Sequence, residues 1–240
     1  MHIARSVRWL VIAAALVPAV TVMSWAQSGP APYPTMAPVA AYLIPDRAAE
    51  IALASSAAPD AIARHATIMV LGLHGYERAV EGTNGFVCVV ERSWMSPFDA
   101  PEFWNPKMRG PTCFNPAAAR SILPITIRRT ELVLSGSSQP PTVDGVRAAL
   151  ARSTFPPLEQ GAMSYMMSRG GFLNDAAGHW VPHLMFYAAA ADSGSWGADL
   201  AGSPVLLNPQ FLGAPERLAV FMVPLRQWSD GTPAPALTSP

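Results

Sequence analysis

The pattern of apolar and polar positions divides the chain into two strand-rich regions with a helical region between them. The nearly all-apolar run 67–73 predicts a central strand. Later apolar runs predict strands at 162–168, 181–189, 203–207 and 218–223, and helix-start signals predict helices at 48–58, 117–123, 125–134 and 142–152. This order predicts an α+β fold, a mainly antiparallel sheet with two or three helices inserted between an N-terminal β-hairpin or meander and the C-terminal strands.

A hairpin with a two-residue turn is predicted at Asn84-Gly85. Both central residues of such a turn need positive φ, and asparagine and glycine adopt it most readily. That turn would place Arg78 opposite Glu91. It would also place Glu77 opposite Arg92, so that both facing pairs carry opposite charges. Glu91 is therefore interpreted as a structural ion-pair partner, and a catalytic carboxylate is the alternative.

The N-terminus has the pattern of a secretory signal peptide. A short basic region precedes the apolar run 9–23, and Ser24-Trp25-Ala26 supplies small residues three and one before a cleavage point. An uncleaved membrane anchor is the alternative, because the 18 residues 9–26 could just span a bilayer. Pro18 and the small residues favour cleavage, so residues 1–26 are predicted to be a signal peptide.

This export signal sets the expected domain boundaries and compartment. Residues 27–44 are rich in proline and are predicted to be a spacer, 45–231 a single α+β domain, and 232–240 a disordered tail. No later segment has 18 unbroken apolar residues, which predicts no membrane contact after cleavage. The expected location is periplasmic or extracellular.

The two cysteines, Cys88 and Cys113, are predicted to form a disulfide, because an exported chain with an even number of cysteines normally pairs them. Closing a loop of about 25 residues would stabilise the fold by about 3.5 kcal/mol in the chain-entropy description. Two buried free thiols and metal ligation are the alternatives. The bridge would fasten the segment after the hairpin to the hairpin itself.

Residues 93–116 are predicted to be an ordered loop that packs its own aromatic side chains. The segment has five prolines and five large aromatic residues, and it shows neither helical nor strand periodicity. Long ordered loops are often functional. Trp94, Phe103 and Trp104, together with Trp180 near the C-terminal strands, are therefore the candidate binding residues.

His179 and His183 lie four positions apart in a context that argues against a metal site. Pro182 disfavours the helix on which histidines at this spacing would converge, and in a strand they would stand about 13 Å apart. Either they have structural roles, or they act in catalysis or binding with Asp175 orienting an imidazole. The candidate catalytic residues are His179, His183 and Asp175, and no metal site or cofactor is predicted.

Composition narrows the possible partners. The chain carries 16 basic and 16 acidic residues, and only 13% of its residues are charged, so it has no electrostatic footprint for nucleic acid. Lys107, its only lysine, matches neither a P-loop nor a Ser-x-x-Lys motif. The expected partner is an unidentified small molecule or an envelope protein.

Three blocks of residues carry a resemblance: Asn84–Cys88 with Glu91–Trp94, Glu102–Pro106, and Gly178–Trp180 with Pro182–Met185. They resemble a set of exported bacterial proteins of unknown function, over most of residues 45–231. The resemblance implies that these blocks belong to one domain. It implies no activity, ligand or site residue.

The favoured hypothesis is a periplasmic or secreted domain that binds a ligand or partner through the aromatic loop and the edge that carries His179 and His183. The alternative is a hydrolase, with or without a metal ion, that uses these histidines with Asp175 or Glu91. An envelope structural protein is a third hypothesis. The sequence does not decide whether the protein is an enzyme.

Overall fold

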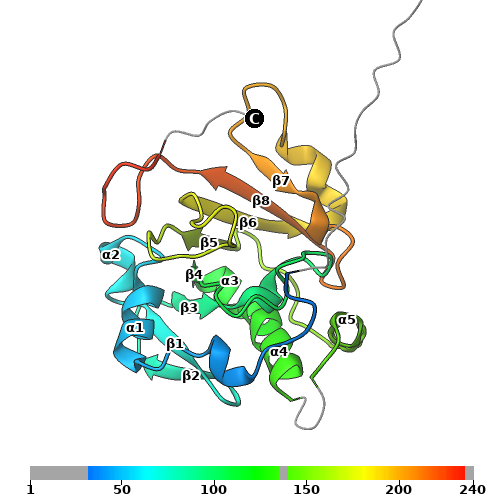
Figure 1. Ribbon diagram of the computed structural model, residues 1–240. Helices are drawn as coiled ribbons and strands as arrows, with labels where there is room; N and C mark the ends of the chain where they lie inside the picture. The colour runs from blue at the N-terminus through cyan, green and yellow to red at the C-terminus, as the bar shows by residue number, and fades with distance from the viewer. Residues whose placement is uncertain (1–31, 136–139, 236–240) are drawn as a thin grey trace, which may run out of the picture. The chain divides into compact units, whose positions relative to one another are not determined.

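A mostly antiparallel eight-stranded sheet and its helices make up the described chain, which confirms the predicted α+β class (Figure 1). The computed structural model describes residues 32–135 and 140–235. The predicted signal peptide, the start of the predicted spacer and residues 236–240 of the predicted tail lie outside the described residues.

The strands follow the order β2-β1-β3-β4-β5-β6-β8-β7, in which β1 and β3 are a parallel pair. They are β1 (Thr67–Gly72), β2 (Gly75–Val80), β3 (Val87–Glu91), β4 (Gly110–Phe114), β5 (Met163–Met166), β6 (His183–Ala189), β7 (Leu206–Asn208) and β8 (Leu218–Pro224). Strands β1 and β5 to β8 overlap the apolar runs that predicted them.

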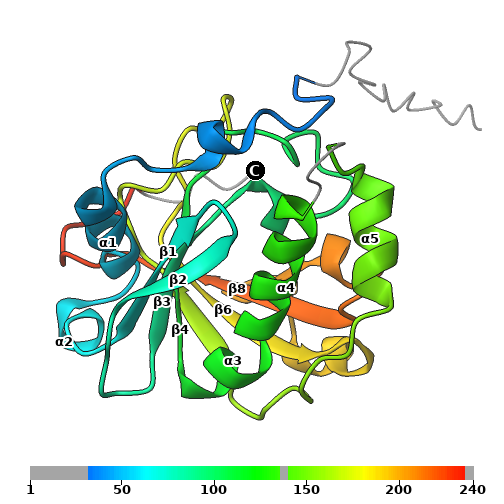
Figure 2. The same cartoon turned by 90° about the horizontal axis from the view of Figure 1, so that it is seen from below.

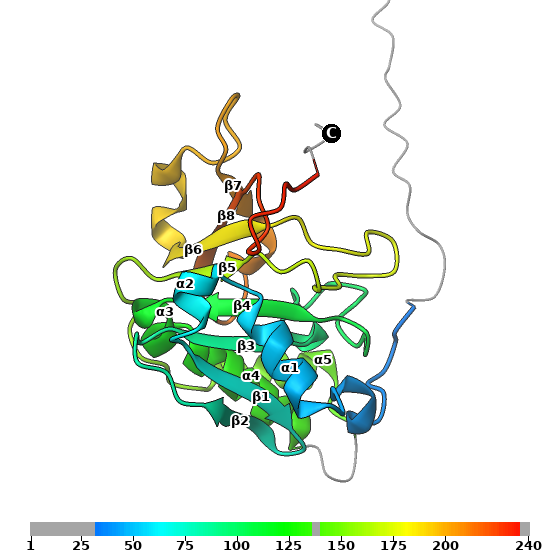
Figure 3. The same ribbon diagram turned by 90° about the vertical axis from the view of Figure 1, so that its left-hand side faces the viewer.

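Helices cover both faces of the sheet. They are α1 (Arg47–Ser55), α2 (Asp60–Ala63), α3 (Pro116–Ser121), α4 (Leu123–Leu134) and α5 (Val143–Ala151). Figures 2 and 3 show α1 and α2 on one side of β1, β3 and β4, and α4 and α5 on the other. We call these sides the α1 face and the α4 face. Side chains of Asp46, Asn115 and Thr142 cap α1, α3 and α5.

Alternation along β3 decides which side chains each face receives. Cys88 and Val90 pack on the α1 face with Ala54 of α1 and with Ala57 and Ala58, which follow it. Val89 packs with side chains of α3 and α4, and Glu91 accepts a hydrogen bond from Thr126 of α4. The sequence therefore places a carboxyl group beneath a helix, at the end of a buried strand.

The prediction of a two-residue turn at Asn84-Gly85 is wrong. β1 pairs with β2 across a tight turn at Leu73-His74, and Asn84-Gly85 lies in the longer connection from β2 to β3. There the backbone N–H of Asn84 donates to the carbonyl group of His65, 3.2 Å away. Gly85 does adopt a positive φ of 76°, but that freedom shapes the local bend and does not choose the partner strand.

The charge pairs expected from that turn are also wrong. Arg78 contacts Glu81 at 2.6 Å, and Arg92 contacts Glu50 of α1 at 2.8 Å. Glu91 has no ion-pair partner among the described residues. The interpretation of Glu91 as a structural ion-pair partner is therefore wrong.

The disulfide between Cys88 and Cys113 is confirmed. The two residues face each other across β3 and β4, with their Cα atoms 3.9 Å apart. The segment 93–116 is therefore not all loop, because its end forms β4. Pro111 makes this strand hard to recognise in the sequence, because proline is rare in sheets. The strand accommodates it because β5 pairs with β4 only at Cys113 and Phe114, beyond Pro111.

The rest of that segment packs its own aromatic rings. Phe103 stacks on Phe98 with ring centres 5.6 Å apart, and it meets Trp104 edge-on at 4.7 Å. Tyr42 joins the same core and donates a hydrogen bond to the carbonyl group of Trp104 at 2.8 Å. The end of the predicted spacer is therefore packed on the domain.

Hydrogen bonds also hold the last described residues. The backbone N–H of Trp228 donates to the Thr232 carbonyl group, and that of Ala234 donates to the Arg226 carbonyl group, both at 2.9 Å. Residues 232–235 of the predicted tail are thus folded back on the chain. Across the described ranges, no helix has the length and apolar character needed to cross a membrane.

Candidate functional site

The predicted binding residues of the aromatic loop face the core. Trp94, Phe103 and Trp104 are 0%, 2% and 3% exposed and belong to one cluster with side chains of α4 and α5. Trp94 donates from Nε1 to the hydroxyl group of Thr130 at 3.0 Å. Their burial gives these rings a packing role, and direct contact with a ligand stays a prediction that requires the loop to open.

His179 and Asp175, in the segment before β6, have separate partners. His179 is exposed, and its Nδ1 atom lies 3.0 Å from the Gly171 carbonyl oxygen. Asp175 accepts hydrogen bonds from the Tyr33 hydroxyl group and from Lys107 Nζ, the latter at 2.9 Å. These contacts, that of Tyr33 first, hold the pKa of Asp175 below its usual value. The proposal that Asp175 orients a histidine ring stays a prediction.

His183, the first residue of β6, is buried and neutral. Its Nδ1 lies 2.6 Å from the Val181 carbonyl oxygen, so Nδ1 carries the proton and Nε2 is an acceptor. Burial lowers the pKa of His183 and favours this neutral ring. The ring centre of Trp180 lies 6.0 Å away, and neither its indole N–H nor His183 Nε2 has a hydrogen-bond partner among the described residues.

A different group of polar side chains surrounds a cavity of about 70 Å³ on the α4 face, which we call the Glu91 cavity. Its apolar lining comes from Met95, Phe114, Ile122, Ile125, Met185, Phe211, Leu218 and Val220, and its polar lining from Glu91, Thr126, Arg129, Tyr187 and Glu216. A mostly apolar cavity with a few converging polar groups is the usual form of a small-molecule site.

Two hydroxyl groups hold the carboxyl group of Glu91. Thr112 Oγ1 lies 3.0 Å from Oε2, and Thr126 Oγ1 lies 3.1 Å from Oε1. Thr112 Oγ1 is also 3.1 Å from the Gly110 carbonyl oxygen, and its single proton serves only one of the two acceptors. A protonated Glu91 resolves this conflict by donating to Thr112. Burial raises the pKa of Glu91 to about 7, which agrees with that assignment.

Arg129 of α4 and Glu216, two residues before β8, form a buried ion pair at the cavity. Arg129 Nη1 lies 3.2 Å from Glu216 Oε1, and the two side chains are 1% and 5% exposed. Arg129 also donates from Nη2 to the Ser96 carbonyl group at 2.7 Å, and it lies 3.9 Å from the ring centre of Phe98. Burial lowers the pKa of Arg129 to about 10, so it remains charged at neutral pH.

Each partner of this pair has an atom without a hydrogen bond. Arg129 Nε is a buried donor and Glu216 Oε2 a buried acceptor, and neither has a partner among the described residues. Such atoms are uncommon, because each costs about 1–3 kcal/mol. Arg217, directly after Glu216, has a φ of 53°, which non-glycine residues seldom adopt. Strained backbone of this kind is typical of ligand sites.

The sequence predictions missed Arg129 and Glu216 and assigned Glu91 to a structural ion pair with Arg78 across a hairpin. Arg129 carries a usable signal, because it lies four residues after Ile125 and four before Val133, in the apolar stripe of α4. A charged residue in such a stripe is buried and needs a partner. Glu216 carries no signal of this kind, because it lies in an irregular segment.

Metal ligation has no cluster to support it within residues 32–135 and 140–235, where no three His, Cys, Asp or Glu side chains gather. No family model, curated protein or solved structure matches the chain. Among the described residues, the Glu91 cavity is where buried polar groups without partners meet a cavity.

Proposed function

We propose that the protein binds a small molecule in the Glu91 cavity, through a group that offers one hydrogen-bond acceptor and one donor. The observation that carries this proposal is the presence of two unused atoms, Arg129 Nε and Glu216 Oε2, on side chains that line the same cavity. A free donor and a free acceptor on ion-paired side chains are complementary to a carboxamide, which has both kinds of atom in one plane.

The size of the cavity limits the group that it receives. A volume of about 70 Å³ holds a few water molecules or a group of a few heavy atoms. Met185, Phe211 and Leu218 line the cavity and are partly exposed, so they offer an apolar path for the rest of a ligand. We therefore expect a small amide with a short apolar chain.

The charges around the cavity favour a neutral ligand. Arg129 and Glu216 compensate each other, and Glu91 with a pKa near 7 is largely protonated below neutral pH. A charged ligand would leave an unpaired charge in a buried site, which is costly. Neutral amides should therefore bind more tightly than free carboxylic acids or amines.

The binding test is a titration of the purified protein with propionamide, followed by amide chemical shifts in NMR spectra. We expect saturable shifts around Glu91, Thr126 and Glu216. Glu216→Gln replaces the free acceptor with a donor and should weaken binding about tenfold. Glu131→Gln is the matched control, because Glu131 is an exposed glutamate of α4 and does not line the cavity.

Two results would contradict the binding proposal. One is a titration that produces no saturable shifts at these residues in the folded protein. The other is unchanged affinity in a folded Glu216→Gln variant, because the unused acceptor would then play no part in recognition.

We also propose that the protein acts in the periplasm or outside the cell. The disulfide is compatible with an oxidising compartment, and the N-terminal pattern supports export. Intact mass measurement of the protein expressed in a bacterium tests this, and we expect a mature chain that begins at Gln27. A full-length chain held in the membrane fraction would contradict it.

Acid–base hydrolysis is a second candidate, with Glu91 in place of His179 and His183. The supporting observation is a carboxyl group with a pKa of about 7 at a cavity lined by a second carboxyl group, that of Glu216. Turnover of small amides that falls at least about a hundredfold in Glu91→Gln would favour the enzyme. Propionamide binding without turnover of any amide would favour the binding function.

A further inference from the structure

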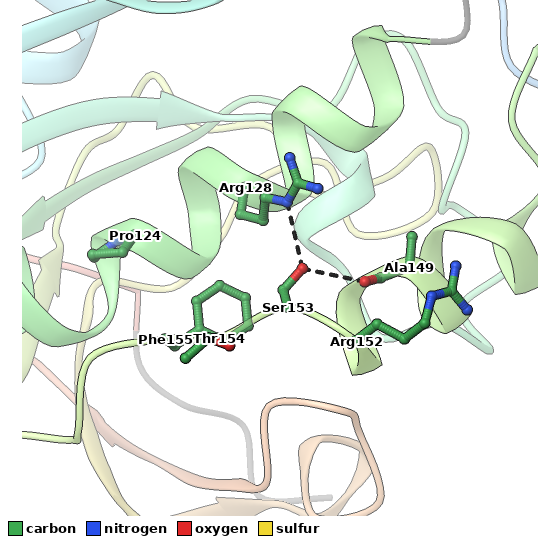
Figure 4. Close-up of a pocket in the computed structure, with 7 residues that line it drawn as sticks. All are labelled: Pro124, Arg128, Ala149, Arg152, Ser153, Thr154 and Phe155. Carbon is green, nitrogen blue, oxygen red and sulfur yellow. Dashed lines mark hydrogen bonds between the residues drawn. The ribbon is translucent and has the colours of Figure 1, made fainter.

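A cleft of about 440 Å³ lies between α4, the C-terminal end of α5 and residues 153–155 (Figure 4). Its volume is within the range of small-molecule sites. It shares no lining residue with the Glu91 cavity, so a ligand bound here is independent of the proposed function.

Apolar rings form one part of this cleft. Pro124, at the start of α4, and Phe155, after α5, both line it (Figure 4). Phe155 is partly buried and packs against the core cluster that contains Val146 and Leu150 of α5. The ring is therefore held in place, with part of its surface available for a flat apolar group.

Both charged residues of the lining are arginines. Arg128 projects from α4, and Arg152 follows α5 directly. Arg128 also contacts Glu131 at 3.2 Å, but both side chains are nearly half exposed, and such pairs contribute little stability. Arg152 is exposed and has no ion-pair partner among the described residues. An anion can therefore bind both guanidinium groups without breaking a strong contact.

The hydroxyl groups of the cleft complete its polar part. Ser153 accepts a hydrogen bond from Arg128 Nε at 3.4 Å and donates one to the Ala149 carbonyl group at 3.2 Å (Figure 4). The backbone N–H of Arg152 donates to the same carbonyl group at 3.2 Å, so two donors offset part of the negative charge that the end of α5 presents to the cleft. Thr154 lines the cleft and is exposed, which leaves its hydroxyl group free to donate.

We propose that this cleft binds a small molecule that carries an oxyanion, a phosphate or a carboxylate, on a flat apolar ring. Arg128 and Arg152 hold the oxyanion, with Arg152 swinging inward on its long flexible side chain from the outward position that Figure 4 shows. Thr154 donates to the same group. The ring of the ligand packs on Phe155 and Pro124.

The test is an NMR titration of the purified protein at low ionic strength with phenyl phosphate and, separately, with benzoate. These probes distinguish the two oxyanions. Saturable shifts are expected at 124–128 and 149–155 for at least one of them, with affinity that falls as salt is added. Inorganic phosphate and benzyl alcohol, which lack the ring or the charge, should each bind at least about tenfold more weakly.

Variants separate this site from general attraction to basic residues. Arg128→Gln with Arg152→Gln should weaken binding at least about tenfold. Glu131→Gln, which frees Arg128, should strengthen it. Arg64→Gln removes an exposed, ion-paired arginine of similar exposure outside the cleft and should change nothing.

The proposal is overturned if neither phenyl phosphate nor benzoate produces saturable shifts in the cleft. It is also overturned if the double arginine variant, shown by its NMR spectrum to be folded, binds as tightly as the unmodified protein. Equal losses in Arg64→Gln and in the double variant would likewise contradict it, because the attraction would then not be local.

Discussion

Two buried ion pairs, one on each face of the sheet, join an arginine to a glutamate in different ways. On the α1 face, Arg92 contacts Glu50 at 2.8 Å, and the side chains are 0% and 2% exposed. On the α4 face, Arg129 contacts Glu216 at 3.2 Å, with side chains 1% and 5% exposed. Burial and charge are nearly the same, so the difference lies in the remaining hydrogen bonds.

The pair on the α1 face is fully engaged. Arg92 also donates to the carbonyl groups of Tyr42 and Val90, and Glu50 accepts from the backbone N–H of Leu71 at 3.1 Å. Neither side chain has a buried polar atom without a partner. This pair links α1, β1 and the end of β3, and it leaves nothing for a ligand to bind.

The pair on the α4 face is incomplete. Arg129 Nε and Glu216 Oε2 have no partner among the described residues, and both side chains line a cavity. Burial of an ion pair therefore does not by itself identify a functional site. Unused hydrogen-bonding capacity beside a cavity distinguishes a candidate site from a structural contact.

The largest effect is expected when the fully engaged pair is broken. Arg92→Met should reduce the free energy of unfolding by about 4 kcal/mol, because it leaves the Glu50 carboxylate buried without its counter-charge. Urea denaturation measures this loss. Arg47→Met, at an exposed salt bridge, is the control and should change stability by less than about 1 kcal/mol.

Removing the disulfide tests how much a covalent link stabilises the α1 face. Replacing Cys88 and Cys113 together with alanine should reduce the free energy of unfolding by about 3.5 kcal/mol, because the unfolded chain gains loop entropy. Urea denaturation with and without a reductant measures it. Reductant should destabilise the unmodified protein and leave the alanine variant unchanged, and an effect on both would contradict the assignment.

The pH dependence of stability tests the carboxyl group on the α4 face. The pKa of Glu91 is about 7 in the folded protein, against 4.5 as its ordinary value. The folded state therefore keeps this proton while the unfolded state releases it, so the contribution of Glu91 to the free energy of unfolding should fall by about 3 kcal/mol as pH rises from 4.5 through 7.

Glu91→Gln stays neutral and should lack that fall, and Glu131→Gln is the exposed control that should retain it. Denaturation series across this pH range compare the three proteins. Identical slopes for Glu91→Gln and the unmodified protein would show that folding does not raise the pKa of Glu91.

The smallest effect is expected for the incomplete pair. Arg129→Met should cost about 2 kcal/mol, less than Arg92→Met, because the adjacent cavity lets water reach the Glu216 carboxylate that remains. The same denaturation experiment measures it. A loss equal to that of Arg92→Met would remove the energetic difference between the two faces.

The parts of the fold that the sequence predicts are those with local or covalent signals. Proline and side-chain caps mark α1, α3 and α5, apolar runs mark β1 and β5 to β8, and export with two cysteines marks the disulfide. The partner of β1 has no local signal. Asn84-Gly85 favours a bend wherever it lies, and tertiary packing decides that Leu73-His74 forms the turn between paired strands.

The candidate site was only partly visible for the same reason. Glu91 was a candidate residue in the sequence, but its predicted ion pair required a strand register that the structure does not have. Arg129 is detectable from the apolar stripe of α4. Glu216 becomes visible only when the segment before β8 folds over that helix, because no local pattern marks its contact with Arg129.

A crystal structure of the protein soaked with propionamide tests the central claim most directly. We predict an amide whose oxygen accepts from Arg129 Nε and whose nitrogen donates to Glu216 Oε2, inside the cavity that Glu91 lines. A structure in which protein groups satisfy both atoms, with propionamide absent from the cavity, would contradict the account.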